Sequence, residues 1–433
     1  MVDSSERGEP GQAEATRLFL AMILILTFVM NTIGRGVTET FAVFLLPVQD
    51  GLGVTRSEIT LTYSIYMLAN GFTAPFAGQL IDRFGARVTY GLGVLSLGVG
   101  YFLAGYATHI ARYYICAGLL GGIGAASLGM VAASSLLSRW FVNRIGSVMS
   151  LPYAAIGAGM IAIPPLAQLL VGWYGWRTTH QIIGAGVLAL FPFAMMLPLG
   201  RITAGSAAWR SRRAAQTGDA ARNPWPLSVV VRTGAFWGLF AAYLFTSISA
   251  YSVLPQSVAA LIESGFAPLL AASAFGMMGL LSTLGIVVMG WMSDRFGRLI
   301  TVTLSYIISI AGALALIATV LHPSLILLYA FVICFGLMQG ARGPILVSLV
   351  SVLYPGGGVG SIFGALSLGL GIGAAFGSWA SGLLHEVVGG YTASFGLAVL
   401  SSTAGLLIFH LVPSLRHERL TPPVPTTSEA ERR

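Results

Sequence analysis

Long apolar stretches, separated by short polar segments, repeat along almost the whole chain. A helix needs about 20 apolar residues to cross the hydrocarbon core of a bilayer. Twelve stretches meet this criterion, in two sets of six. The first set covers 19–47, 57–80, 88–107, 111–137, 145–170 and 179–199, and the second covers 233–261, 267–291, 299–320, 324–352, 359–384 and 392–412. The pattern predicts an all-α membrane protein with twelve transmembrane helices.

Three polar segments complete the expected domain organisation. Residues 1–18 form an N-terminal tail, 201–232 a solvated linker rich in Arg, and 413–433 a C-terminal tail. The two six-helix halves are therefore expected over 19–200 and 233–412. The start of the chain has no cleavable-signal pattern, because its first apolar stretch is too long for a signal sequence and has a polar centre.

Composition and charge placement agree with a membrane location. Hydrophobic residues make up 56% of the chain and charged residues 9%, whereas a soluble protein carries about 25% charged residues. Eighteen of the 23 basic residues lie in the tails and even-numbered loops, and three lie in the odd-numbered loops. By the positive-inside rule, both termini are expected in the cytoplasm and the protein in the plasma membrane, the inner membrane in a bacterium. The net charge of +8 then reflects topology rather than nucleic-acid binding.

No pattern in the sequence indicates an enzyme or a cofactor. The two cysteines, Cys116 and Cys334, lie inside apolar stretches, so they predict neither a disulfide framework nor a metal site. A phosphate-binding Gly-x-x-x-x-Gly-Lys-Ser/Thr loop does not occur, which argues against ATP-driven transport.

The first predicted span carries a polar stripe. Asn31, Arg35 and Glu39 are spaced four residues apart, so they share one helix face. An Arg near the centre of a span costs roughly 2.5–3.5 kcal/mol on insertion scales, so the stripe should face protein or water rather than lipid. We expect it to form one wall of a substrate path.

A second buried arginine is expected in the tenth span. Arg342 is flanked by Gly340, Gly343 and Pro344, which can break the helix there. The planar guanidinium suits a carboxylate, so Arg35 and Arg342 are the candidate contacts for an anionic substrate. The alternative for each is a structural ion pair or hydrogen-bond network between helices.

Glu39 has two possible roles. Burial would favour its protonated form and suit it to proton coupling, whereas Arg35, one helical turn away, would hold it as a permanent ion-pair partner. Other polar groups within the spans either line the path or make interhelical contacts. These groups are Asn31, Tyr66, Asn70, Tyr153, Tyr251 and Gln339.

Two internal repeats indicate pseudo-symmetric halves. The segment GQLIDRFGAR (78–87) recurs as GWMSDRFGRL (290–299), and GSVMSLPYAAIGAG (146–159) has a looser copy in GSIFGALSLGLGIG (360–373). Parallel six-helix repeats joined by a cytoplasmic loop are typical of secondary transporters.

The repeated Gly-x-x-x-Asp-Arg-x-Gly loop resembles the signature of the major facilitator superfamily. The resemblance implies a cytoplasmic gating loop that holds neighbouring helix ends and releases them when the site turns inward; a tight charged turn without that role is the alternative. Ala86 stands where the family usually has a basic residue. The two copies are Gly78, Asp82, Arg83 and Gly85, and Gly290, Asp294, Arg295 and Gly297.

Within that superfamily the chain looks like the monocarboxylate porter branch. The similar segments are ETFAVFLLPV (39–48), Ser138–Phe141, Gly157–Pro164, Gly175–Arg177 and GARGP (340–344). The chain departs from the branch in having no basic residue in the eighth and eleventh predicted spans.

The resemblance implies a secondary active transporter of small organic anions, monocarboxylates above all. It would work as a monomer among membrane lipids, by alternating access, with proton symport or anion exchange. The alternative is an exporter of hydrophobic drugs or metabolites on the same fold, which would depend little on Arg342.

Overall fold

The computed structural model describes residues 10–141, 145–206, 209, 211, 226–354 and 359–416, and over these residues it contains helices but no strand. The helices of the first half are α1 (Pro10–Glu39), α2 (Phe41–Leu52), α3 (Arg56–Ala104), α4 (Ile110–Tyr113), the π-helix η1 (Tyr114–Leu120), α5 (Gly121–Leu128), α6 (Met130–Trp140), α7 (Ile145–Met196) and α8 (Leu199–Ala204). The remaining helices are α10 (Leu227–Val230), α11 (Gly234–Glu263), α12 (Pro268–Phe296), α13 (Arg298–Leu321), α14 (Leu325–Met338), α15 (Arg342–Leu353), α16 (Val359–Val388), α17 (Tyr391–Leu411) and α18 (Pro413–Arg416).

Helices α3 and α7 each contain two predicted spans, joined at a glycine with positive φ. Gly85 has φ 82° and ψ 173°, and Gly175 has φ 74° and ψ 167°. Glycine adopts such a backbone without the strain that a Cβ would cause. Gly85 belongs to the first Asp-Arg motif, and Gly297 of the second motif has φ 86° and ψ 156°. Both copies of the motif therefore form the same kind of turn.

The predicted membrane fold is confirmed. Within the described residues, nine helical segments are long and apolar enough to cross a membrane. Two of these, Arg56–Ala104 and Ser150–Met196, each cover most of two predicted spans. The remaining predicted span, 324–352, is divided into α14 and α15 by a turn at 339–341. Each of the twelve predicted spans is thus mostly helical.

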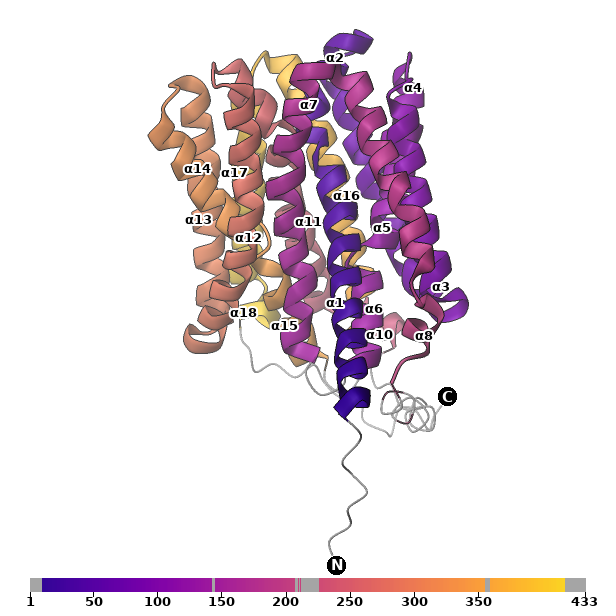
Figure 1. Ribbon diagram of the computed structural model, residues 1–433. Coiled ribbons are helices and arrows are strands. Elements are labelled where there is room, and N and C mark those ends of the chain that lie inside the picture. The colour runs from indigo at the N-terminus through magenta and orange to yellow at the C-terminus, as the bar shows by residue number, and fades with distance from the viewer. Residues whose placement is uncertain are drawn as a thin grey trace, which may run out of the picture.

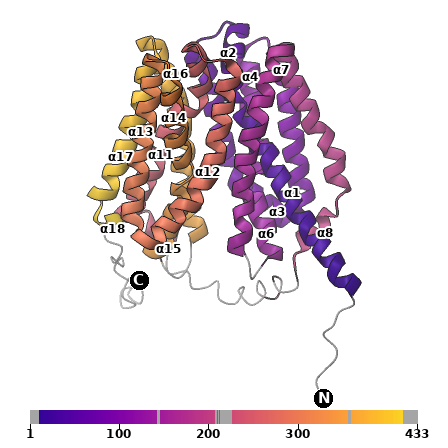
Figure 2. The ribbon, with the colours of Figure 1, turned by 60° about the vertical axis from the view of Figure 1, so that its left-hand side comes forward.

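The helices run side by side as a bundle (Figure 1). Helices α2 and α4 lie at one end of the bundle, and α6, α8, α15 and α18 lie at the other end. In the turned view, α1 to α8 occupy one side of the molecule and α11 to α18 the other (Figure 2). We call the end with α2 the outer end and the opposite end the inner end.

The boundaries expected for the tails, the linker and the two halves stay a prediction. Parts of these segments lie outside the described residues, namely 1–9, 207–208, 210, 212–225 and 417–433. The described start of the linker packs on the first half, where Trp140 Nε1 donates a hydrogen bond to Ile202 O at 2.7 Å.

Small residues let the two halves approach closely near the middle of the bundle. A Cβ on Gly157 of α7 would lie 2.8 Å from Gly279 O of α12, which is closer than side-chain atoms pack. Interfaces between transmembrane helices are rich in such residues, because packing rather than the hydrophobic effect holds them together in lipid. This contact brings α7 and α12 together beside the centre of the molecule.

Polar contacts join the halves at the outer end. Arg56 Nη2 lies 2.6 Å from Glu263 Oε1, and Ser57 Oγ donates to Glu386 Oε2 at 2.6 Å. Arg56 is 4% exposed on its side chain and Glu263 38%. We call these four residues the outer lock. They connect the start of α3 with the ends of α11 and α16.

Candidate functional site

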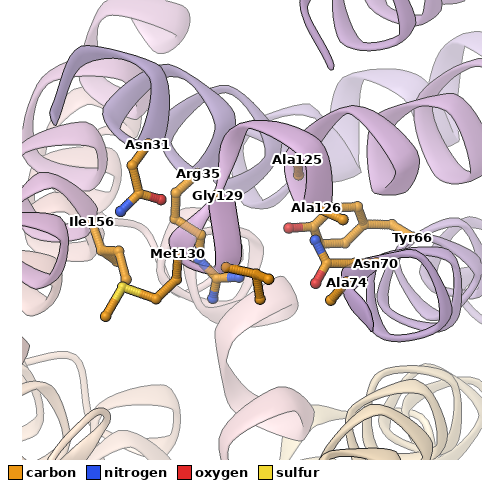
Figure 3. A pocket seen from close by; sticks show the side chains of 11 residues that line it. Asn31, Arg35, Tyr66, Asn70, Ala74, Ala125, Ala126, Gly129, Met130 and Ile156 are labelled. Carbon is orange, nitrogen blue, oxygen red and sulfur yellow. The ribbon is translucent and has the colours of Figure 1, made fainter. Parts of the chain in front are cut away.

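Two cavities meet at Arg35. The first has a volume of about 150 Å³ and is bordered by Asn31 and Arg35 of α1, Tyr66 and Asn70 of α3, and small side chains of α5 (Figure 3). The second has a volume of about 140 Å³ and lies mainly on the other half. Its border is Arg35, Tyr153, Ile156, Ala250, Tyr251, Leu254, Ser282, Thr283, Ile286, Gln339 and Gly340. Arg35 and Ile156 border both, so they separate the two central cavities.

The guanidinium of Arg35 connects the two halves. Its Nη2 lies 2.7 Å from Glu39 Oε1, one helical turn along the same helix, and donates to Tyr251 OH of α11 at 3.2 Å. The Arg35 side chain is 22% exposed, whereas that of Glu39 is 1% exposed. A buried charge is stabilised only when it is paired and hydrogen-bonded, which Glu39 and Tyr251 provide. Arg35 is thus a paired cation that still reaches the cavities.

Glu39 is enclosed by the first half. Tyr63 OH of α3 donates to both of its carboxylate oxygens, at 3.3 Å and 3.2 Å. With Arg35 on one side and Tyr63 on the other, Glu39 has both an ion pair and a hydrogen-bond donor. The Tyr63 hydroxyl can donate a hydrogen bond to an ionised carboxylate and can accept one from a protonated carboxyl group.

The other predicted path residues divide between the two cavities. Asn31 and Tyr66 border the first, whereas Tyr153, Tyr251 and Gln339 border the second. Asn31 Nδ2 donates to Pro152 O at 2.6 Å and Tyr66 OH pairs with Thr38 Oγ1 at 3.0 Å, so each also makes an interhelical or local contact. Gln339 Oε1 is buried without a hydrogen-bond partner in the described structure, which leaves it available to a donor in the cavity.

Arg342 borders neither central cavity. It is 5% exposed, and its Nε donates to Ser305 Oγ at 3.0 Å and its Nη2 to Ser305 O at 3.0 Å and to Ser309 Oγ. Its guanidinium carbon lies 4.1 Å from the centre of the Tyr306 ring. Arg342 therefore connects the start of α15 with α13. Its predicted contact with substrate stays a prediction, while the network matches the structural alternative.

The two Asp-Arg loops differ in their partners. Asp82 forms an ion pair with Arg139 of α6, and Arg139 Nη1 donates to Thr203 O at 2.7 Å. Asp294, at the equivalent place in the second half, forms no ion pair with any residue that the structure describes. Arg83 and Arg295 are exposed beside aromatic rings. The first loop is thus tied to its neighbouring helices.

Sequence reasoning missed three residues of the site. Tyr63 lies three residues before Tyr66 on the same helix, so the helical period could have indicated it. Ser282 and Thr283 are adjacent polar residues in a mostly apolar span, and both border the second cavity. Their polarity alone was a weak signal, because hydroxyl side chains in helices often bond their own backbone.

The fold and the site define a membrane transporter, and the comparisons with known proteins agree. The sequence model of the Major Facilitator Superfamily matches residues 20–286 and 239–432. The chain belongs to the Major Facilitator Superfamily.

Relatives place it near the monocarboxylate branch, as predicted. Monocarboxylate transporter 13 of Bos taurus is 26% identical over 89% of this chain and 88% of its own length. The uncharacterized MFS-type transporter YcxA of Bacillus subtilis is 24% identical over 92% of this chain and 96% of its own length.

Solved structures show the same fold. The D-xylose-proton symporter superposes with a TM-score of 0.71 at 14% identity, covering 92% of this chain and 99% of that protein. A bacterial homolog of human lysosomal transporter Spinster, in an inward-facing and unoccupied conformation, gives a TM-score of 0.70 at 13% identity, covering 96% and 100%.

Proposed function

We propose that this protein is a secondary active transporter of small organic anions, with monocarboxylates as its substrates. The observation that supports this most is Arg35, a partly exposed cation that borders both central cavities between the two halves. A guanidinium offers two parallel donors that match a carboxylate. The names of relatives such as monocarboxylate transporter 13 point to the same substrate class.

Cavity size favours a small substrate over a large hydrophobic one. The two central cavities measure about 150 and 140 Å³, whereas pockets for drug-sized ligands measure about 300–1,000 Å³. Their borders carry amide and hydroxyl groups beside the apolar ones. A short carboxylate on Arg35 would use these groups, and a large apolar drug would leave them without partners.

Charge balance requires a coupled ion. Arg35 and Glu39 neutralise each other in the site described here. A bound carboxylate adds one negative charge to a poorly solvated region, which is costly unless another charge compensates it. Protonation of Glu39 would compensate this negative charge, and the protein would then be a proton symporter. Movement of a second anion in the opposite direction would also compensate it, and the protein would then be an anion exchanger.

Alternating access would move the site between the two membrane faces. The outer lock joins the halves at the outer end in this conformation. The Asp82–Arg139 pair would act as the cytoplasmic gating contact that the family signature implies. We place the protein in the plasma membrane as a monomer, the inner membrane in a bacterium, with both termini cytoplasmic, because basic residues concentrate on that side.

Uptake into proteoliposomes tests this function. Purified protein should take up labelled short monocarboxylates, and the uncharged amides of the same acids should not compete. Arg35→Gln should weaken substrate affinity about 10- to 100-fold, the scale of a lost hydrogen bond to a charged group. Arg112→Gln, at an exposed position of α4, is the matched control and should transport normally.

Two outcomes would reject the proposal. One is Arg35→Gln transporting the acids with unchanged affinity. The other is transport of uncharged apolar compounds in place of the acids, which would favour the drug-exporter alternative.

A further inference from the structure

A histidine that solvent can reach lies beside the outer lock. His385 is near the end of α16, and its Nε2 is 3.8 Å from Glu263 Oε2. Arg56 is paired with the other oxygen of the same carboxylate, Glu263 Oε1. The side chain of His385 is 20% exposed and that of Glu263 is 38% exposed. His385 can therefore exchange a proton with the solution directly.

Glu263 has a positive or potentially positive neighbour in each half. Arg56 belongs to α3 of the first half, so its ion pair with Glu263 of α11 joins the halves. His385 of α16 and Glu263 both belong to the second half, so a pair between them joins nothing across the interface. The two contacts therefore compete, because one carboxylate that turns toward His385 holds Arg56 less well.

Arg56 depends on Glu263 for its charge compensation. The Arg56 side chain is 4% exposed, and its Nη2 donates to Glu263 Oε1 at 2.6 Å. Its Nε and Nη1 are buried and have no hydrogen-bond partner in the described structure. A buried cation that loses its partner is strongly destabilised, whereas an exposed one is hardly affected. Weakening this one pair therefore destabilises the closed outer end.

The remaining neighbours of His385 include a ring that it shares with Arg56. The ring centres of His385 and Tyr391 of α17 are 4.4 Å apart, and the guanidinium carbon of Arg56 is 5.7 Å from the centre of the Tyr391 ring. A proton on His385 thus places a second positive charge near Arg56. Glu386 follows His385 on α16 and would attract that charge. Together with Glu263, these are the charged and titratable groups around His385.

His385 also lies where α16 and α3 are in direct contact. Ser378 Oγ donates to Thr60 O of α3 at 3.1 Å, and a Cβ on Gly382 would overlap the Thr60 side chain. His385 follows Gly382 by three residues, which is about one helical turn. A change of charge at His385 therefore acts at the interface between the halves.

We propose that His385 makes the outer lock sensitive to pH, so that protonation of His385 opens the outer end of the transporter. Neutral His385 leaves Glu263 to Arg56, and the halves stay joined. Protonated His385 attracts Glu263 within the second half and repels Arg56 of the first half. Separation of the halves relieves this repulsion and lets water solvate Arg56. The proton thus favours the outward-open state, as any ligand favours the state that it binds better.

This inference rests on the alternating access in the proposed function, but it does not depend on the identity of the substrate. It adds a response to the compartment at the outer end, because acid there favours the state in which the site is open to that compartment. Histidine ordinarily changes its charge at about pH 6.5, so the response falls within the range that cells meet.

The distance between two spin labels at the outer end tests the proposal. Asp50→Cys labels an exposed position of α2, and Pro323→Cys labels an exposed position between α13 and α14. α11 ends at the outer end with Glu263, and two further helices return the chain to that end before Pro323. Cys116→Ala and Cys334→Ala remove the native thiols. Pulsed electron paramagnetic resonance measures the distance at about pH 8 and about pH 5, on either side of the usual titration of histidine.

Three proteins with this label pair should give three different results. With native His385, the ratio of the long to the short distance should rise about tenfold on acidification, as expected if the open state binds the proton about tenfold more tightly. His385→Gln takes up no proton and should keep the short distance at both pH values. His385→Arg carries a permanent charge and should show the long distance at both.

His109→Gln is the matched control, since His109 is an exposed histidine that precedes α4 at the same end of the bundle. It should respond to pH as the native sequence does. Thermal unfolding at both pH values verifies that each variant is folded.

The outcomes separate the pH response from the lock and from the function. An unchanged pH response in His385→Gln would assign it to another group and overturn the proposal. A native distance that ignores pH, while Glu263→Gln lengthens it, would also overturn the proposal but keep the outer lock as a gate. A pH response that needs His385, in a protein that carries no monocarboxylate, would support the proposal and reject the proposed substrate alone.

Discussion

At the scale of single residues, the site depends on one ion pair whose two members differ in exposure. Arg35 is partly exposed to the central cavities, whereas Glu39 is buried and receives a second hydrogen bond from Tyr63. A group that enters the central cavities can therefore reach Arg35 more easily than Glu39. Spacing along the helix predicted that Arg35 and Glu39 would share a face and left open whether they pair. It did not predict Tyr63, which belongs to another helix.

Glu39→Gln tests coupling at this scale. The amide keeps the shape of the side chain but cannot take up a proton, so uptake should lose its dependence on the pH gradient while exchange persists. Transport is measured with and without an inward proton gradient. Glu58→Gln is the control, since Glu58 only caps its own helix through Thr55. Full pH-driven uptake by Glu39→Gln would show that Glu39 is a permanent partner of Arg35.

At the scale of helices, breaks in the regular backbone place the polar groups. The tenth span is broken at 339–341, which puts Gln339 and Gly340 at the second cavity and turns Arg342 toward α13. The pattern of Gly340, Gly343 and Pro344 indicated a break in the helix. The direction of the Arg342 side chain beyond this break depends on which groups α13 presents to it. Ser305, Ser309 and Tyr306 provide acceptors and an aromatic face there.

Arg342→Met tests whether this arginine holds helices or binds substrate. Interhelical hydrogen bonds in membranes contribute about 0.6 kcal/mol each, so losing three should destabilise the protein by about 2 kcal/mol. Unfolding is followed by SDS titration, and substrate affinity is measured in the same preparation. A role in packing predicts lower stability with unchanged affinity. A large loss of affinity with unchanged stability would instead support the predicted contact with substrate.

At the scale of the whole molecule, the outer lock joins the two halves at one end of the bundle. Arg56 and Glu263 belong to different halves and are 207 residues apart in sequence. The inner end has a different arrangement, since the Asp82–Arg139 ion pair lies within one half. Among the residues that the structure describes, the polar contacts named here between the halves lie at the centre and the outer end.

Glu263→Gln should shift the protein toward an outward-open state. Removing one charge from the pair weakens the closed outer end, and a loss of about 1.4 kcal/mol changes the ratio of the two states tenfold. The substitution Ile156→Cys, made together with Cys116→Ala and Cys334→Ala, reports access to the central cavities. Its labelling by an impermeant maleimide from outside should become faster.

Glu58→Gln is the matched control for this experiment, since it replaces a carboxylate by an amide at a residue whose side chain accepts from Thr55 N of its own half. Exchanging the two charges, with Arg56→Glu and Glu263→Arg together, should restore slow labelling. Equal labelling of Glu263→Gln and the control would show that the outer lock does not set access.

The sequence by itself determined the membrane class, the twelve spans, the repeated turns and the polar stripe of the first span. These features follow from local quantities: the apolar length of a segment, the helical period and the backbone freedom of Gly85 and Gly297. Only the tertiary structure decided which groups meet, namely Arg35 with Tyr251, Glu39 with Tyr63, Arg56 with Glu263, and Arg342 with α13. Those contacts join distant segments, and their geometry depends on how whole helices pack, which the hydrophobic pattern of each helix leaves open.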